Sequence, residues 1–429
     1  MASTSSTESS TDAPGTSNSI PESNQLVITM ADKTKVPEEE YARGGFLRVN
    51  PGQFINHHQL VKYLGRGTFG TVWLTKHTES GTYAAMKISK SNITCPDAAG
   101  REIQFLENID SRGGHPNIVK LMEKLVTHDI GIGHVAMVFE VLGPNLESVI
   151  FDSGRTFPVE VVKRVSRQLL EAISFVHNRD IIHMNIKSSN VMLAISENNI
   201  KNLVSNPDSS SNRYDIDLTK ADARIVVKLA DFGHALYSYE NMPDRHLETN
   251  CLFRAPEQFL TTNYDTALDM WSFGCMLYEM VAGSLLFPCK QYFLDHDRVH
   301  FMLMANRFGP ITLADFEDGL RPEFLENFND DGQMNVEDMG EPLPNFFEMA
   351  QQEGWSAEDA NDFSTFMHLL FKYNRGERIT ADEALRHNFI RSNGVRQAEE
   401  APAVPPLALD YPEAEEVFDR VVPLPDDEE

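Results

Sequence analysis

The sequence predicts an α+β fold in which a small, antiparallel, β-rich region precedes a larger, mainly helical region. Two patterns carry this prediction. Residues 60–87 contain short apolar, strand-like runs around a glycine-rich turn, and residues 157–178 repeat apolar side chains at helical spacing. Further along the chain, residues 181–193 enclose a polar loop between apolar segments, and the chemistry of the chain centres on that loop.

The composition indicates a folded chain. Its 429 residues are 41% hydrophobic and include 26 Phe, enough for a sizeable core. No apolar run reaches the roughly 18 residues that a membrane span needs, and no secretory signal is visible. We therefore expect a monomer without membrane contact, in the cytoplasm, the nucleus or both. The cysteines show no metal or disulfide pattern, so free thiols are expected at Cys95, Cys251, Cys275 and Cys289.

The formal charge of −27 is concentrated in two stretches. Residues 309–365 hold fifteen Asp and Glu against Arg321, and residues 398–429 hold eleven against Arg420. This balance argues against direct binding to nucleic acid. Two interpretations stay open: solvated acidic faces with a disordered tail, or a surface that attracts a basic, Arg-rich protein.

Changes of composition along the chain predict its organisation. The expected parts are a disordered, Ser/Thr-rich N-terminal tail (1–50), a β-rich region (51–143), a helical region (144–392) and an acidic, Pro/Glu-rich disordered tail (393–429). Within the helical region we expect a short insert loop over 196–224 and an acidic helical insert over 309–365.

A glycine-rich motif lies in the β-rich region, Gly65-Arg66-Gly67-Thr68-Phe69-Gly70. A lone G-x-G-x-x-G is a weak signal, because dinucleotide-binding folds also use it before a helix. Here strand residues such as Val72 follow, so the motif predicts a hairpin whose backbone covers the phosphates of a nucleotide. Lys87 closes the next apolar strand. It is either an edge residue that faces solvent or the lysine that contacts the α- and β-phosphates.

The polar loop places Asn185, Lys187 and Asn190 at positions i, i+2 and i+5. This is the H-x-D-x-K-x-x-N spacing of the protein-kinase catalytic loop, with Asn185 where the pattern has Asp. The strand over 225–230 then presents Asp231-Phe232-Gly233, a tripeptide that gains meaning only after such a loop. Asp231 is expected to chelate Mg²⁺, and Asn190 to provide a second Mg²⁺ site.

These landmarks, ordered over residues 58–390, resemble the eukaryotic protein-kinase superfamily. Residues 134–146 and 165–170, together with an insertion before Asp231, look like the SR-protein kinases. The resemblance implies a bilobal protein-kinase fold with helix C in the N-lobe. It also implies transfer of the ATP γ-phosphoryl group, with Mg²⁺, to Ser of Arg/Ser-rich proteins. Met184 stands where most kinases have Arg, so switching by phosphorylation of the activation loop is not expected.

The resemblance also assigns roles to individual residues. Catalytic roles fall on Asn185 and Lys187, and metal binding falls on Asn190 and Asp231. The implied ATP-binding residues are Gly65, Arg66, Gly67, Thr68, Phe69, Gly70, Val72, Ala85, Lys87, Glu102, Glu140, Leu142 and Met192. Among them, Glu102 is expected to pair with Lys87, and the backbone over 140–142 to hydrogen-bond adenine.

Two further pairings are expected to support the site. Glu257 and Arg378 should form a buried ion pair, and Asp269 should brace the backbone of the catalytic loop. Both roles are structural rather than chemical.

The chain departs from the family pattern at three places. Asn185 replaces the Asp that accepts the substrate's hydroxyl proton, and Ser188-Ser189 replaces the usual Pro-Glu/Asp. Asn250 stands where a Thr normally bonds the catalytic loop, with Thr249 one residue out of register. General-base help is worth about 10²–10⁴ in rate, so a weakened Ser/Thr kinase is expected. The alternatives are a pseudokinase scaffold that binds nucleotide and a basic partner, and a kinase-like fold without nucleotide.

Overall fold

The chain divides into two units, Met1–Val395 and Arg396–Glu429, and every residue described below belongs to the first. The computed structural model describes residues 26–29, 36, 38–42, 44–91, 94–129, 132–153, 157–207, 211–240, 250–261, 264–289, 296–316, 320–335 and 345–391. The predicted tail over 393–429 therefore lies outside the described residues, as does Thr249.

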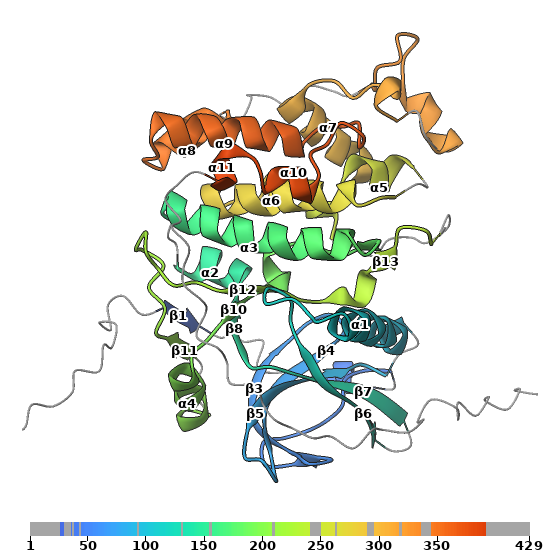
Figure 1. Ribbon diagram of the computed structural model, residues 1–429. Helices are drawn as coiled ribbons and strands as arrows, with labels where there is room; N and C mark the ends of the chain where they lie inside the picture. Colours follow the sequence, from blue (N-terminus) through green and yellow to red (C-terminus); the bar gives the residue numbers. More distant parts are fainter. Residues whose placement is uncertain are drawn as a thin grey trace, which may run out of the picture. The chain divides into compact units, whose positions relative to one another are not determined.

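The N-terminal half of the fold is an antiparallel sheet of six strands in the order β2-β3-β4-β5-β7-β6 (Figure 1). The strands are β2 (Phe54–Ile55), β3 (His58–Arg66), β4 (Gly70–His77), β5 (Tyr83–Ser89), β6 (Leu121–Asp129) and β7 (Ile132–Phe139). Alternating apolar residues on these strands bury one compact cluster that includes Leu60, Trp73, Met86 and Val138. Helix α1 (Thr94–Ser111) packs against β5, β6 and β7.

The C-terminal half is helical. Its helices are α2 (Leu146–Ser153), α3 (Val159–His177), α5 (Pro256–Leu260), α6 (Ala267–Ala282), α7 (His296–Phe308), α8 (Phe346–Gln352), α9 (Ala357–Leu370), α10 (Ala381–Ala384) and α11 (Asn388–Arg391). Helix α6 is buried nearly all round, and it lies between α3 and α9 (Figure 1). A helix that is apolar on all faces belongs in the middle of a core, which explains this layering. No described helix has the length and apolarity needed to cross a bilayer.

A buried ion pair ties α5 to the C-terminal part of the helical region. Arg378 donates from Nη1 and Nη2 to the two carboxylate oxygens of Glu257, at 2.6 and 3.0 Å. Both side chains are essentially inaccessible to solvent, and the guanidinium also lies 5.2 Å from the ring of Trp271. The predicted Glu257–Arg378 pair is confirmed. Its bidentate geometry is what makes two buried charges tolerable.

Part of the first fifty residues is ordered, contrary to the predicted disorder. Strand β1 (Leu26–Thr29) pairs antiparallel with β11 (Ser211–Tyr214), which lies inside the predicted insert loop. The same insert contains helix α4 (Glu197–Ser205), capped by the Ser196 hydroxyl. Leu26 and Ile28 are buried against the helical region. Local composition could not reveal this, because the pairing partner lies far along the chain and the strand is short.

In the described residues of the acidic segment over 309–365, regular α-helix is confined to the second part. Up to residue 335 it contains short 3-10 turns, η7 (Leu313–Phe316) and η8 (Pro322–Asn327), and isolated bridges such as Thr312 to Gln333. Regular helix begins at Phe346 with α8 and continues in α9. The predicted helix is therefore wrong for the first part of the segment. Gly309 and Gly332 adopt positive φ there, and Pro322 cannot lie inside an α-helix.

Candidate active site

Lys87 lies near the end of β5 and points to two carboxylates. Its Nζ is 2.6 Å from Glu102 Oε2 on α1 and 3.4 Å from Asp231 Oδ1. Burial alone would lower the pKa of Lys87, but the two carboxylates outweigh burial and raise that pKa. The predicted pairing of Lys87 with Glu102 is confirmed. The lysine stays charged near neutral pH and is positioned by α1.

Asp231 follows β12 (Val227–Leu229) in a left-handed backbone conformation, with φ of 69°. Phe232 behind it is fully buried, and its ring meets the ring of His183 edge-on at 4.7 Å between centroids. Burial alone would raise the pKa of Asp231, but the charge of Lys87, followed by His234 and Lys187, lowers it to about 2. Asp231 is therefore ionised, and its hard oxygens suit Mg²⁺.

Two antiparallel ladders bring the catalytic loop to Asp231. β9 (Ile181–Ile182), before the loop, pairs with β13 (Leu236–Tyr237), which follows Asp231. β10 (Val191–Ala194), after the loop, pairs with β12, which precedes Asp231. The loop and the Asp231 turn are thus held at both ends against each other. This register explains why residues some 45 positions apart form one site.

Asp269, near the start of α6, holds the first turn of the catalytic loop. Its two carboxylate oxygens accept hydrogen bonds from the backbone N–H of His183, at 2.7 Å, and of Met184, at 2.9 Å. Met184 adopts a left-handed φ of 68°, which costs roughly 1–2 kcal/mol for a non-glycine residue. The Asp269 carboxylate is buried, and these charge-assisted bonds offset that strain. The predicted bracing role of Asp269 is confirmed.

Asn185 and Asn190 form a chain of amide hydrogen bonds. Asn185 Nδ2 donates to Asp231 Oδ2 at 3.0 Å, and Asn190 Nδ2 donates to the Asn185 carbonyl at 2.8 Å. Both residues are buried. An amide at position 185 can hold a hydroxyl group but has no lone pair basic enough to take its proton. The arrangement keeps the geometry of a catalytic loop without its carboxylate base.

The glycine-rich loop turns between β3 and β4, as predicted. The Gly67 N–H donates to the Gly70 carbonyl at 2.9 Å, and Thr68 at the tip is exposed. A side chain at residue 70 would place its Cβ 2.4 Å from the Ile88 carbonyl oxygen, so Gly70 is required for the approach of β4 to β5. The Phe69 ring lies 5.4 Å from the ring of His234, next to Asp231-Phe232-Gly233.

The residues assigned to adenine lie where the strands of the N-terminal sheet meet the β8 region. The register places Val72 opposite Lys87, and Ala85 opposite Phe139 at the end of β7. Met192 in β10 pairs with β8 (Leu142–Asn145), the strand that begins with Leu142. The Glu140 side chain binds Lys228 at 2.8 Å and accepts from the Lys120 N–H at 3.0 Å. Both contacts use Oε1 of Glu140, so the side chain is engaged within the protein, and the expected contact of this backbone with adenine stays a prediction.

Two features lie outside the predicted site. Asn250 is exposed and caps the turn η6 (Cys251–Phe253) by accepting from the Leu252 N–H at 3.1 Å, so its side chain serves local structure. Glu40, in the turn η3 (Glu38–Tyr41), lies 2.6 Å from Arg66 and 3.6 Å from Lys90. Sequence reasoning missed Glu40 because its acidic run lay in a stretch that resembled a disordered tail.

Comparisons with known proteins agree with this geometry. The model of the protein kinase domain matches residues 58–390, more than half of the chain. Serine/threonine-protein kinase SRPK from Physarum polycephalum is 29% identical over 82% of this chain and 90% of its own length. Serine/threonine-protein kinase AFC1 from Arabidopsis thaliana is 28% identical, over 77% of this chain and 70% of its own length.

A third relative, dual specificity protein kinase CLK2 from Mus musculus, is 27% identical over 80% of this chain and 66% of its own length. The predicted α+β kinase fold and the SR-kinase-like resemblance are confirmed. This chain belongs to the protein kinase family, and it is similar to members named SRPK and CLK.

Proposed function

We propose that this protein binds ATP with Mg²⁺ and transfers the γ-phosphoryl group to Ser of Arg/Ser-rich proteins, at a rate reduced by Asn185. The carrying observation is the hydrogen bond from Asn185 Nδ2 to Asp231 Oδ2, 3.0 Å long, beside an intact Lys87–Glu102 pair. The groups that neutralise phosphate charge are present, and the group that takes a proton is absent. Activity is therefore weakened at one step only.

The residues of the site support positioning more than proton transfer. Lys87, held by Glu102, supplies positive charge for the phosphates, and Asp231 and Asn190 supply oxygen ligands. Mg²⁺, when bound, would neutralise charge that develops on the transferred group. Asn185 can orient the attacking hydroxyl group of the protein substrate. The proton of that hydroxyl must then pass to an oxygen of the transferred phosphoryl group or to water. Because positioning and electrostatics dominate phosphoryl transfer, the missing base lowers the rate without abolishing it.

The choice of an Arg-rich substrate rests on charge. The acidic stretch over 309–365 exposes carboxylates on its described surface, at Glu326, Asp330, Asp331, Glu348 and Glu358. Such a surface attracts basic chains and raises their association rate. The similarity to a kinase named SRPK supports the same substrate class. We place the protein in the cytoplasm or nucleus as a monomer, where an Arg/Ser-rich protein would be available to it.

A second candidate function is a nucleotide-binding scaffold for a basic protein partner. The same Asn185–Asp231 hydrogen bond favours it, because it occupies an oxygen of Asp231 with a neutral donor. In that case the protein would bind nucleotide and partner without transfer of phosphate. The two functions share the nucleotide site and differ only in chemistry.

Single-turnover transfer from radiolabelled ATP to an Arg/Ser-repeat peptide separates the two functions. We expect the natural protein to label the peptide and Asn185→Asp to label it about 10²-fold faster or more, because a carboxylate base is restored. Asp231→Ala is the control, and label that persists in that variant would come from a contaminating kinase. If neither protein labels the peptide while ATP still raises the melting temperature, the scaffold function holds instead.

A further inference from the structure

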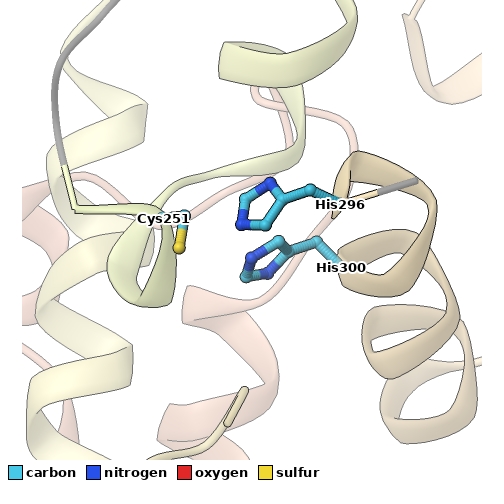
Figure 2. Close-up of side chains that lie close together, drawn as sticks. All are labelled: Cys251, His296 and His300. Atoms are coloured by element: carbon cyan, nitrogen blue, oxygen red, sulfur yellow. The ribbon is translucent and has the colours of Figure 1, made fainter. Parts of the chain in front are cut away.

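The side chains of one cysteine and two histidines lie close together in the structure (Figure 2). All three residues are far from Asn185 in the sequence. Cys251 lies in the turn η6, and His296 and His300 lie one helical turn apart on α7. One potential ligand atom from each of the three, the Cys Sγ and a ring nitrogen of each His, all lie within 4.8 Å of one another. The i, i+4 spacing on α7 explains how both rings reach the same side of the helix.

His300 is the strongest sign that the cluster has a ligand. The side chain is fully buried, yet neither ring nitrogen has a hydrogen-bond partner among the described residues. Among the described residues, its ring neighbours are Phe259, stacked at 5.2 Å, and His296 at 4.8 Å. An unpaired buried donor or acceptor is energetically costly, so native structures rarely leave one without a partner. A metal ion bound at one ring nitrogen would supply the missing interaction.

His296 has the second contact that metal-binding histidines usually show. Its Nδ1 lies 3.1 Å from Asp297 Oδ1, so Nδ1–H donates to the carboxylate and Nε2 keeps its lone pair. A cysteine sulfur and two imidazole nitrogens make up the donor set, which suits zinc better than Mg²⁺ or Ca²⁺.

The distances fit zinc after small side-chain movements. A tetrahedral zinc ion with bonds of about 2.0–2.3 Å holds its ligand atoms roughly 3.3–3.8 Å apart. The three ligand atoms therefore need to approach by up to about 1 Å, which small rotations of Cys251 and of the half-buried His296 would supply. The fourth position of the tetrahedral site would be left for water.

We propose that Cys251, His296 and His300 bind a zinc ion that ties η6 to α7. The turn η6 leads directly into α5, whose Glu257 belongs to the buried pair with Arg378. Zinc would thus fix the segment in front of α5 to a separate helix of the C-terminal half. The site is independent of ATP binding and of the proposed phosphoryl transfer.

Zinc binding to the purified full-length chain tests the proposal directly. We expect the metal-free protein to bind one zinc equivalent, measured by elemental analysis and by titration calorimetry. Cobalt in place of zinc should give a thiolate-to-cobalt charge-transfer band that Cys251→Ser removes. Cys251→Ser should weaken zinc binding at least about tenfold, and Asp297→Asn, which weakens the support of His296, about tenfold.

Matched controls separate this site from the catalytic centre and from general effects on folding. Cys275→Ser changes a buried thiol on α6, away from the cluster, and Asp231→Ala removes the carboxylate of the catalytic centre. Both should bind zinc as the natural protein does. If Cys251→Ser does not fold, His296→Gln, at a half-buried position, gives the same test.

Three results would overturn the proposal. The first is a metal-free protein that takes up no zinc at one-to-one stoichiometry. The second is equal zinc affinity in Cys251→Ser and Cys275→Ser. The third is a disulfide between Cys251 and Cys289 in the protein as purified under non-reducing conditions, seen by mass spectrometry, because it would consume the thiol that zinc requires.

Discussion

The catalytic centre has two halves that differ in how charge is arranged. The phosphate half, made of Lys87, Glu102 and Asp231, is a line of charged groups in which the lysine lies between two carboxylates, at 2.6 and 3.4 Å. The proton half, made of Met184, Asn185 and Asn190, contains only neutral groups joined by amide hydrogen bonds. One half matches the expected kinase geometry, and the other keeps the backbone geometry without the reactive carboxylate.

This difference shows what the amide at position 185 contributes to its neighbour. A carboxylate at position 185 would bring a second negative charge to within about 3 Å of Asp231 Oδ2, where an amide now donates a hydrogen bond. Asn185 therefore stabilises Asp231 in the absence of metal. Under the proposed function, this stability comes at the expense of proton transfer, a trade-off that is common in active sites.

The comparison breaks most strongly at the phosphate half. Lys87→Met removes the positive charge that faces both Glu102 and Asp231, so we expect transfer to fall by about 10²–10³-fold or more and the ATP-induced rise in melting temperature to disappear. Lys124→Met is the matched control, because Lys124 pairs with Glu107 at 2.7 Å in a solvent-exposed position. Equal loss in the two variants would show that the effect is not specific to the phosphate half.

The next largest effect should be a pH dependence of the free energy of unfolding, caused by a buried carboxyl group next to the catalytic loop. Glu279 on α6 is fully buried, and burial raises its pKa to about 7. The hydroxyl of Ser188 in the catalytic loop acts in the opposite direction and lowers that pKa. The folded state therefore keeps a proton that the unfolded state releases near pH 4.5. The resulting stability is fully present below that pH and is lost as pH rises through about 7.

Gln at position 279 cannot ionise, so the stability difference between Glu279→Gln and the natural protein should shift by about 3 kcal/mol in favour of the variant between acidic pH, below the usual glutamate pKa of 4.5, and pH 8. Denaturant unfolding at the two pH values measures the difference. Glu348→Gln, at an exposed position on α8, should show no such dependence. A constant difference between Glu279→Gln and the natural protein over this pH range would contradict the raised pKa.

The sequence predicted those parts of the site that depend on local spacing. Lys87, Asp231 and Asn190 were found from motif intervals, and the Glu257–Arg378 pair and the Asp269 brace followed from the family pattern. What could not be predicted depends on contacts between distant segments that carry no local signal. The pairing of Leu26–Thr29 with Ser211–Tyr214, the Glu40–Arg66 ion pair and the fully buried His300 are of this kind.

The predicted free thiols are confirmed at Cys251, Cys275 and Cys289, but the sequence did not single out the cluster around Cys251. Zinc motifs are recognised in sequences by closely spaced cysteine and histidine pairs. Here His296 and His300 have a helical spacing that fits metal, but Cys251 lies far upstream in a separate turn, and only the fold places it beside α7. A single pair of histidines on a helix more often reflects ordinary packing, so the sequence alone could not single out this cluster.

The smallest expected effect tests the comparison between the two halves directly. Without metal and nucleotide, Asn185→Asp should lower the free energy of unfolding by about 1 kcal/mol at pH 8, because two carboxylates then face each other where the amide hydrogen bond of 3.0 Å had been. Mg²⁺ with ATP should restore the stability of the variant, since the metal supplies the missing positive charge. Thermal unfolding with and without Mg²⁺ and ATP measures both changes.

Asn178→Asp is the matched control for this measurement. Asn178 also donates from Nδ2 to a carboxylate, Asp382 Oδ2 at 3.3 Å, but in an exposed position at the end of α3. Water screens the two charges there, so we expect a change of a few tenths of a kcal/mol at most and no response to Mg²⁺ and ATP. If Asn185→Asp behaves like this control, the amide is not needed to stabilise Asp231, and the loss of the base has no structural benefit.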